Sequence, residues 1–126
     1  MNILGISRVE PRNQKLFQRT GVAYVMVGAV EVTSLGKMTT EWRMTATYMG
    51  YTRRDLRRFL ERISHQKPRR AHHGERAYAT LAGAVAIAQG AVEVASLGKL
   101  TTNWTMLWMC YGEEIIERIT GAFRKP

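Results

Sequence analysis

The chain has 126 residues, enough for one ordinary domain but too few for two independent domains of typical size. Hydrophobic residues make up 45% of it, which excludes a disordered polyelectrolyte. Nineteen Lys and Arg against ten Asp and Glu give a formal net charge of +9, and so large a surplus on a small domain indicates a polyanionic partner, usually nucleic acid.

Cysteine content and apolar runs indicate the compartment. Cys110 is the single cysteine, which excludes an internal disulfide, and no Cys and His residues stand at zinc-site spacing. The longest apolar stretch, residues 21–30, is shorter than the roughly 20 residues that a membrane span needs. We therefore expect an intracellular protein of a reducing compartment, cytoplasm or nucleoid, with no membrane partner.

An internal duplication organises the chain. Residues 28–44 read GAVEVTSLGKMTTEWRM and residues 90–106 read GAVEVASLGKLTTNWTM, at an offset of 62. Between residues 21–44 and 83–106, fourteen of the twenty-four aligned positions are identical. Two copies are too few for an open array, so the repeat predicts two like halves about a pseudo-twofold axis.

The first copy is predicted to begin with a helix and a hairpin. Residues 14–27 contain valines that favour a strand, but symmetry with the second copy predicts a helix, which we adopt. Residues 29–34 then form the first strand of a hairpin that turns at residues 35–37. Residues 38–48 alternate in polarity with a period of two, which is typical of a half-buried strand.

A second helix is predicted to close the first copy. Thr52 is a suitable N-cap for a helix over residues 53–64, in which apolar residues recur at helical spacing. Residues 65–74 follow with Pro, Gly and several basic residues and no apolar periodicity, which indicates a linker.

The second copy is predicted to repeat this order. Residues 75–89 are alanine-rich and favour a helix. Strands over residues 91–96 and 100–110 form the second hairpin, and residues 113–123 form the closing amphipathic helix.

The predicted fold is therefore α+β, an internally duplicated αββα-αββα arrangement with pseudo-twofold symmetry and a four-stranded antiparallel sheet. Residues 1–126 form one compact domain, made of repeat one (14–64), a basic linker (65–74) and repeat two (75–123). The internal pseudo-dimer predicts a monomer, and a further homodimer through Leu107, Met109 or the carboxy-terminal helix stays open.

Small-residue helices that run into a strand through glycine, at residues 21–28 and 81–90, give the chain a resemblance to the LAGLIDADG homing endonucleases. The resemblance implies two helices packed by their small residues and a saddle of four strands that straddles DNA. The acidic residue that binds the catalytic metal in that family corresponds to Val27 and Gln89 here, neither of which is a carboxylate. The resemblance thus implies the DNA-binding surface and argues against the cleavage chemistry.

The candidate binding residues fall into two groups. The hairpin tips and the outer strand faces offer cations, hydroxyls and an amide that can bond phosphates or base edges; these are Lys37, Thr39, Glu41, Arg43, Thr45, Lys99, Thr101, Asn103 and Thr105. The basic helix and the linker offer phosphate contacts of the sequence-independent kind, from Arg53, Arg54, Arg57, Arg58, Lys67, Arg69 and Arg70. An ordinary polar sheet face and a solvated helix face are the simpler interpretations of the same residues.

Chemical activity has weaker support. Glu31 and Glu93 occupy equivalent positions and could hold a metal ion in a nuclease, but an exposed strand carboxylate is the simpler interpretation. We predict no cofactor, no metal site and no catalytic residue. The leading hypothesis is a non-catalytic regulator or accessory factor that binds duplex DNA. The alternatives are a structural RNA-binding ribonucleoprotein component, a metal-dependent nuclease using the two glutamates, and an inhibitor that binds an acidic protein.

Overall fold

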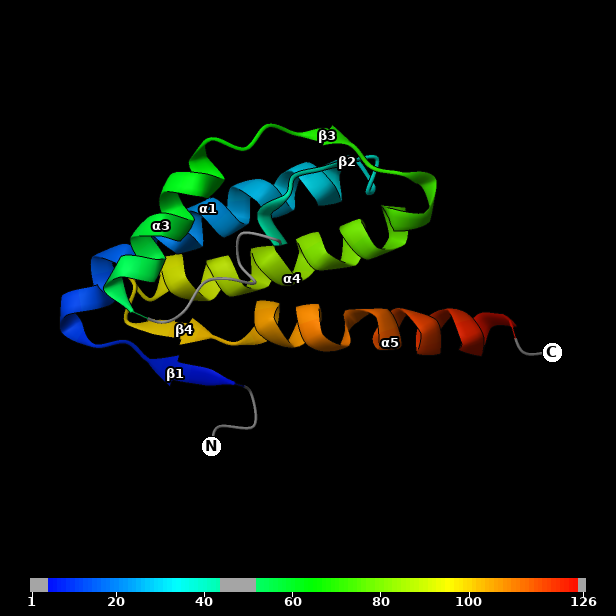
Figure 1. Ribbon diagram of the computed structural model, residues 1–126. Coiled ribbons are helices and arrows are strands. Elements are labelled where there is room, and N and C mark those ends of the chain that lie inside the picture. The colour runs from blue at the N-terminus through cyan, green and yellow to red at the C-terminus, as the bar shows by residue number, and fades with distance from the viewer. Residues whose placement is uncertain (1–4, 44–51, 125–126) are drawn as a thin grey trace.

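Two long helices of similar sequence form the centre of the molecule (Figure 1). The computed structural model describes residues 5–43 and 52–124. Helix α1 spans Gln14–Thr33 and helix α4 spans Arg76–Ala95, 20 residues each. They pack directly against each other along their length.

Glycines at a spacing of seven residues bring α1 and α4 into close contact. A Cβ added to Gly21 would lie 2.9 Å from the carbonyl oxygen of Gly90, and one added to Gly28 would lie 2.5 Å from that of Gly83. Because Gly21 meets Gly90 and Gly28 meets Gly83, the helices run antiparallel. The contact is reciprocal, as the sequence repeat requires: each glycine of one copy faces a glycine of the other.

Each long helix ends in the same turn. Leu35 and Leu97 adopt positive φ angles of 54° and 57°, followed by glycines at 77° and 80°. Ser34 caps the first turn, since its hydroxyl donates to the carbonyl of Val30 at 2.7 Å and accepts from the main-chain N–H of Met38 at 3.0 Å. Glycine tolerates this conformation, whereas leucine pays a steric cost for it.

Short strands tie each turn to the other copy. Strand β1 (Ile6–Arg8) pairs antiparallel with β4 (Leu100–Thr102), and β2 (Met38–Thr39) pairs with β3 (Arg69–Arg70). The two pairings are related by the 62-residue offset, because Arg8 lies opposite Leu100 and Arg70 lies opposite Met38. Short 3-10 turns, η1 (Pro11–Asn13) and η2 (His73–Glu75), lead from β1 and β3 into the long helices.

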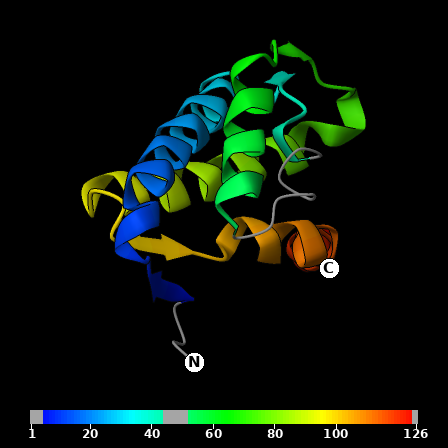
Figure 2. The same ribbon diagram turned by 60° about the vertical axis from the view of Figure 1, so that its left-hand side comes forward.

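The helices that follow differ between the copies. Helix α3 (Arg53–Ser64) lies along α1 (Figure 2), and α5 (Trp104–Arg124) is one 21-residue helix that packs against α4. Between them and the long helices lies an aromatic core in which Tyr24 meets Trp42 edge-on at 5.7 Å and stacks near Phe59 at 5.1 Å. Trp108 of α5 closes the other side of this core.

The structure corrects the predicted fold class. The described residues form two separate two-stranded sheets in a mainly helical molecule, so the predicted four-stranded sheet is wrong, and so is the saddle that the family resemblance implies. The predicted first hairpin strands, residues 29–34 and 91–96, belong mostly to the ends of α1 and α4. The predicted strand over 100–110 ends at Thr102, where α5 soon begins.

Two other element predictions are confirmed, the helix over residues 14–27 and the Thr52 cap, whereas the linker and the strand over residues 38–48 are not. Residues 14–27 are helical, as symmetry predicted against the local preference of the valines. Thr52 caps α3, because its hydroxyl accepts from the main-chain N–H of Asp55 at 3.2 Å. Residues 65–74, predicted as a linker, contain β3 and η2. Of the predicted strand over 38–48, residues 38–39 are extended and residues 42–43 are helical, and the remainder lies largely outside the described residues.

Candidate nucleic-acid interface

Helix α3 presents an arginine-rich face to solvent. Leu56, Phe59 and Ile63 are buried against the core and fix the helix on α1. Seven of its twelve residues are exposed, and five of those seven are arginines: Arg53, Arg54, Arg57, Arg58 and Arg62. The amphipathic pattern that anchors the helix therefore also turns its charge outward.

Within residues 5–43 and 52–124, no carboxylate forms an ion pair with these five arginines. Asp55, on the same helix, instead accepts a hydrogen bond from the Thr52 hydroxyl at 2.6 Å. Five like charges on a helix of about 18 Å repel one another unless counterions or a polyanion neutralise them.

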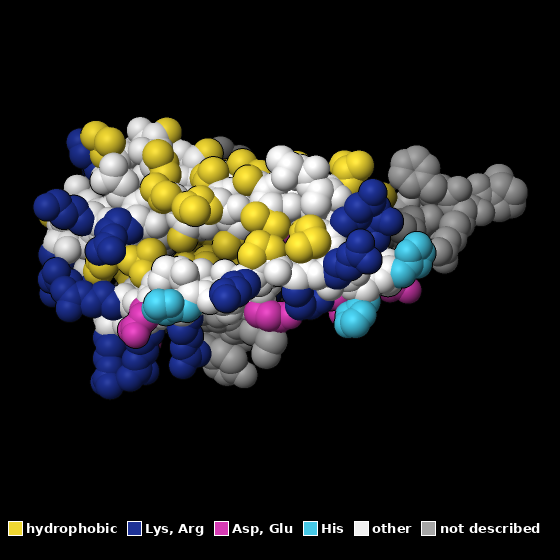
Figure 3. Space-filling model, turned by 90° about the horizontal axis from the view of Figure 1, so that it is seen from above, with side chains coloured by type: hydrophobic (Ala, Val, Ile, Leu, Met, Phe, Trp, Pro, Cys, Tyr) yellow, Lys and Arg dark blue, Asp and Glu magenta, His cyan; other side chains and the backbone are white. Residues whose placement is uncertain are grey.

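A groove runs between α1 and α3, with a volume of about 1360 Å³. Its apolar lining includes Val22, Met26 and Leu60. Its basic lining comes from both helices and the turn before α1, namely Arg12, Lys15, Arg19, Arg53 and Arg57. Figure 3 looks down on this side of the molecule, where hydrophobic side chains run along the surface between a larger group of Lys and Arg on the left and a smaller one toward the right.

Sequence reasoning missed the α1 part of this basic lining. Arg12, Lys15 and Arg19 recur at intervals of three and four residues, which places them on one face of a continuous helix. This spacing of basic residues could be recognised once residues 14–27 were predicted to be a helix.

The predicted sheet-face contacts are not available as predicted. Thr39, Thr101 and Thr105 are buried. Arg43 is turned inward and pairs with Glu31. The prediction failed because it assumed a sheet with one solvent face, whereas these residues line the junction between each turn and the long helices. Thr45 lies outside the described residues.

Glu41 and Arg69 also have internal partners. The Arg69 guanidinium binds Glu41 and donates to Glu75 at 3.1 Å, so it links the segment after β2 to the start of α4. Hydrogen bonding from Arg69, helped by the main-chain N–H of His72, lowers the pKa of Glu75 to about 2. Hydrogen bonds to Glu75 and, to a smaller extent, to Glu41 raise the pKa of Arg69.

The two predicted hairpin-tip lysines lie at opposite ends of the helix pair. The turn before Lys37 packs on Arg76 and Thr80 at the start of α4, and the turn before Lys99 packs on Gln14 at the start of α1. A helix of 20 residues is about 30 Å long, so one site cannot hold both lysines at neighbouring phosphates. Lys99 shares its end of the molecule with the basic α1 start.

The remaining predicted residues are dispersed. Lys67 and Arg70 are exposed, before and within β3. Asn103 is half-buried, and its main-chain carbonyl accepts from the N–H of Leu107 in the first turn of α5. The structure thus brings together the α3 arginines and separates them from most of the predicted hairpin set.

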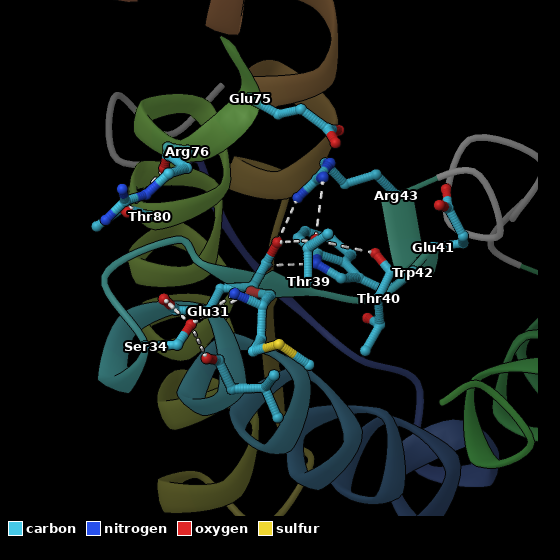
Figure 4. Close-up of polar contacts among 12 residues, drawn as sticks. Glu31, Ser34, Thr39, Thr40, Glu41, Trp42, Arg43, Glu75, Arg76 and Thr80 are labelled. Atoms are coloured by element: carbon cyan, nitrogen blue, oxygen red, sulfur yellow. Dashed lines mark hydrogen bonds and ion pairs between the residues drawn. The ribbon is translucent and has the colours of Figure 1, made fainter. Parts of the chain in front are cut away.

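Glu31 is held by three donors at the end of α1 (Figure 4). The Trp42 indole N–H donates to it at 2.7 Å and an Arg43 guanidinium nitrogen at 2.6 Å, and the Thr39 hydroxyl also donates. The side chain is fully buried, and Arg43 in turn lies over the rings of Trp42 and Tyr78. A carboxylate so surrounded fixes the turn and residues 39–43 to α1.

Glu93, the equivalent residue of α4, has a different environment. It is 1% exposed and accepts from the Thr101 hydroxyl at 2.7 Å, with Thr20 at 3.4 Å. No Lys or Arg of the described residues pairs with it. Burial raises the pKa of Glu93 to about 8, and the two hydroxyls oppose that shift only in part.

The positions of Glu31 and Glu93 argue against the alternative that the two glutamates together hold a catalytic metal. Helix pairing sets Glu31 level with Thr80 and Glu93 level with Gln18, about 13 residues or 20 Å apart along the helix pair. Two-metal sites need ions about 4 Å apart. The part of the chain that the structure describes also contains no group of three or more His, Cys, Asp or Glu placed to hold one metal ion.

Helix α4 with the turn before it, His73–Ala95, is long and apolar enough to cross a membrane by length and composition, and 39% of the apolar window is buried inside the molecule. The core helix of a soluble protein satisfies the same criterion, and α4 packs on both α1 and α5.

Comparison of the chain with known protein families, with curated proteins and with solved structures found no match in any of the three.

Proposed function

We propose that this protein binds duplex DNA without cleaving it, through the exposed arginine face of α3. The observation that supports this is the set of five exposed arginines on one anchored helix, with no carboxylate partner among the described residues. Phosphate contacts from such cations bind nucleic acid with little sequence preference and a strong salt dependence.

The shape of α3 favours duplex DNA over folded RNA. Only three of its twelve residues are buried, so the outer half of the helix is free to enter a groove. The major groove of B-DNA admits an α-helix, whereas that of A-form RNA is too deep and narrow. A helix of about 18 Å spans roughly five base pairs of that groove.

The test compares two double variants that lose equal charge. Arg54→Ala with Arg58→Ala removes two cations from the exposed face of α3, and Arg70→Ala with Arg118→Ala removes two exposed cations elsewhere. Binding to a fluorescent 20-base-pair duplex should weaken at least about tenfold in the first variant and change little in the second. The slope of log affinity against log salt should fall by about 2 in the first variant only.

Two results would contradict the proposal. Equal losses in both double variants would mean that total charge, not α3, governs binding. Tighter binding to a structured RNA hairpin than to the duplex would favour the ribonucleoprotein alternative.

A further inference from the structure

Helix α5 carries an apolar ridge that the molecule leaves uncovered. Four large side chains at intervals of four residues are each 40–54% exposed, namely Leu107, Tyr111, Ile115 and Ile119. Residues at this spacing form one continuous ridge along a helix. In Figure 1 the second half of α5 extends beyond the end of α4, away from the body of the molecule.

The first copy shows how such a ridge is normally covered. In α3, the helix that closes the first copy, the apolar residues Leu56, Phe59 and Ile63 are packed on α1 and are at most 6% exposed. The closing helices of the two copies therefore differ: α3 buries its apolar residues on α1, whereas α5 packs on α4 through another face and keeps this ridge in solvent. Isolated exposed apolar residues are common, but a ridge of four on one helix marks an interaction site.

The α1–α3 groove has the complementary chemistry. Its apolar lining includes Val22, Met26 and Leu60, and five cations line it against a single acidic lining residue among those described, Glu61. Residues 113–118 of α5 carry three glutamates and one arginine. The groove is basic where the ridge-bearing helix is acidic, which favours association of the two surfaces and their mutual orientation.

The dimensions also agree. The groove follows α1 from Gln14 to Val30, about 24 Å, and the ridge from Leu107 to Ile119 needs about 18 Å. The volume of about 1360 Å³ exceeds that of an ordinary small-molecule pocket and suits a helix segment. The groove flanks α1 near α3, whereas the free half of α5 extends from the opposite end of the molecule (Figure 1), so one chain cannot fill its own groove.

We propose that the chain self-associates by inserting the α5 ridge of one copy into the α1–α3 groove of a second copy. The contact joins two different surfaces, so two copies can exchange α5 helices in a closed dimer or continue head to tail. Helix-in-groove recognition of this kind depends on a few apolar anchors, and Ile115 and Ile119 serve as those anchors here.

The test measures mass in solution without any nucleic acid, so its outcome is independent of DNA binding. Sedimentation from 1 to 500 μM should show a mass that rises above 14.3 kDa with concentration. Ile115→Ser with Ile119→Ser should weaken association at least about tenfold, because it removes the apolar anchors. Leu81→Ser, at a comparably exposed leucine on α4, is the matched control and should associate like the wild type.

A charge pair tests the groove itself. Arg19→Glu should weaken association, and combining it with Glu114→Arg should recover part of the loss. Circular dichroism and thermal melting confirm that each variant is folded, which is expected because the altered side chains are exposed. A monomer at every concentration, or loss of association in Leu81→Ser but not in the α5 variant, would overturn the proposal; the latter result would place the contact on α4.

Discussion

Glu31 and Glu93 stand at the same position of the two repeats, near the ends of helices of the same length, yet Glu31 has a cation beside it and Glu93 has only neutral hydroxyl partners. Glu31 is neutralised by Arg43. The residue equivalent to Arg43 in the second copy is Thr105, whose main-chain N–H instead binds Gln89 at 2.8 Å. One difference between the copies therefore decides whether a buried carboxyl group has a cation beside it.

The hydrogen bonds around Glu93 show what the lack of a cation means. The hydroxyl of Thr20 donates to the carbonyl of Phe17 at 2.8 Å and shares its single proton with Glu93 at 3.4 Å. The longer of these two contacts stabilises an ionised carboxylate only weakly, so burial dominates at Glu93. Glu93 can thus stay protonated in a site that has no cation, and its raised pKa predicts that the stability of the second copy responds to pH.

The largest expected effect is the pH dependence that Glu93 confers. Its pKa rises from 4.5 in the unfolded chain to about 8 in the folded one, so the folded state binds an extra proton between these values. This stabilisation is complete below pH 4.5 and is lost as the pH rises toward 8, at a cost of up to about 5 kcal/mol in the free energy of unfolding. Urea unfolding of the wild type and of Glu93→Gln from pH 4.5 to 9 measures it.

Glu93→Gln keeps the shape and both hydroxyl contacts but cannot ionise. Its stability relative to wild type should increase across this range and level off above pH 8. A constant difference between the two proteins at every pH would show that Glu93 does not titrate on folding. Glu75 acts in the opposite direction, because its lowered pKa stabilises the fold above about pH 4.5 and that contribution is lost as the pH falls toward 2.

Arg43→Ala should have the next largest effect. It leaves the fully buried Glu31 without its cation, and breaking such a pair costs about 3 to 5 kcal/mol. Thr105→Ala changes the equivalent position of the second copy, where only a hydroxyl is lost, and should cost about 1 kcal/mol. Urea unfolding at pH 7 measures both variants. Equal losses in the free energy of unfolding would show that the cation at position 43 stabilises its copy no more than Thr105 stabilises the other.

The glycine contacts should respond alike in both copies. Added Cβ atoms at Gly21 and Gly83 meet the same neighbours, a glutamate Cβ at 2.7 Å and a glycine carbonyl oxygen at 2.9 Å. Gly21→Ala and Gly83→Ala should therefore each destabilise by about 2 kcal/mol, because overpacking forces the helices apart. Gly74→Ala, with nothing within 4 Å of its Cβ, is the control and should change the melting temperature little. A clear difference between Gly21→Ala and Gly83→Ala would mean that the repeats are unequal in their backbones as well.

How much of this could be predicted from the sequence depends on whether the deciding contacts are local. Helix α3 was predictable because its cap, Thr52, directly precedes it and its apolar spacing lies within its own twelve residues. The ends of α1 and α4 were not, because Val30, Glu31 and Val32 favour a strand locally. Helix survives there since Gly28 meets Gly83 and Glu31 finds Thr39, Trp42 and Arg43 in the folded chain.

The candidate site also divides into residues that local sequence predicts and residues whose placement depends on tertiary contacts. The α3 arginines were identified from charge alone, which needs no tertiary information. The burial of Thr39 and Thr101 and the inward ion pair of Arg43 could not be foreseen, because alternation of polar and apolar residues was interpreted as a strand. The seven-residue spacing of Gly21 with Gly28, repeated at Gly83 with Gly90, was the available signal that two helices pack closely.

The smallest expected effect uses the repeat as its own control. Lys37 and Lys99 occupy equivalent exposed positions, but only Lys99 lies at the end of the molecule where the basic start of α1 lies. If α3 and its surroundings bind DNA, Lys99→Ala should weaken duplex binding about threefold at low salt, through loss of one peripheral phosphate interaction, and Lys37→Ala should leave it unchanged. Fluorescence anisotropy at 50 mM salt resolves a threefold change. Because the two lysines share sequence context, exposure and turn geometry, any difference between the variants reports position alone, and equal losses would mean that DNA contacts both ends of the helix pair.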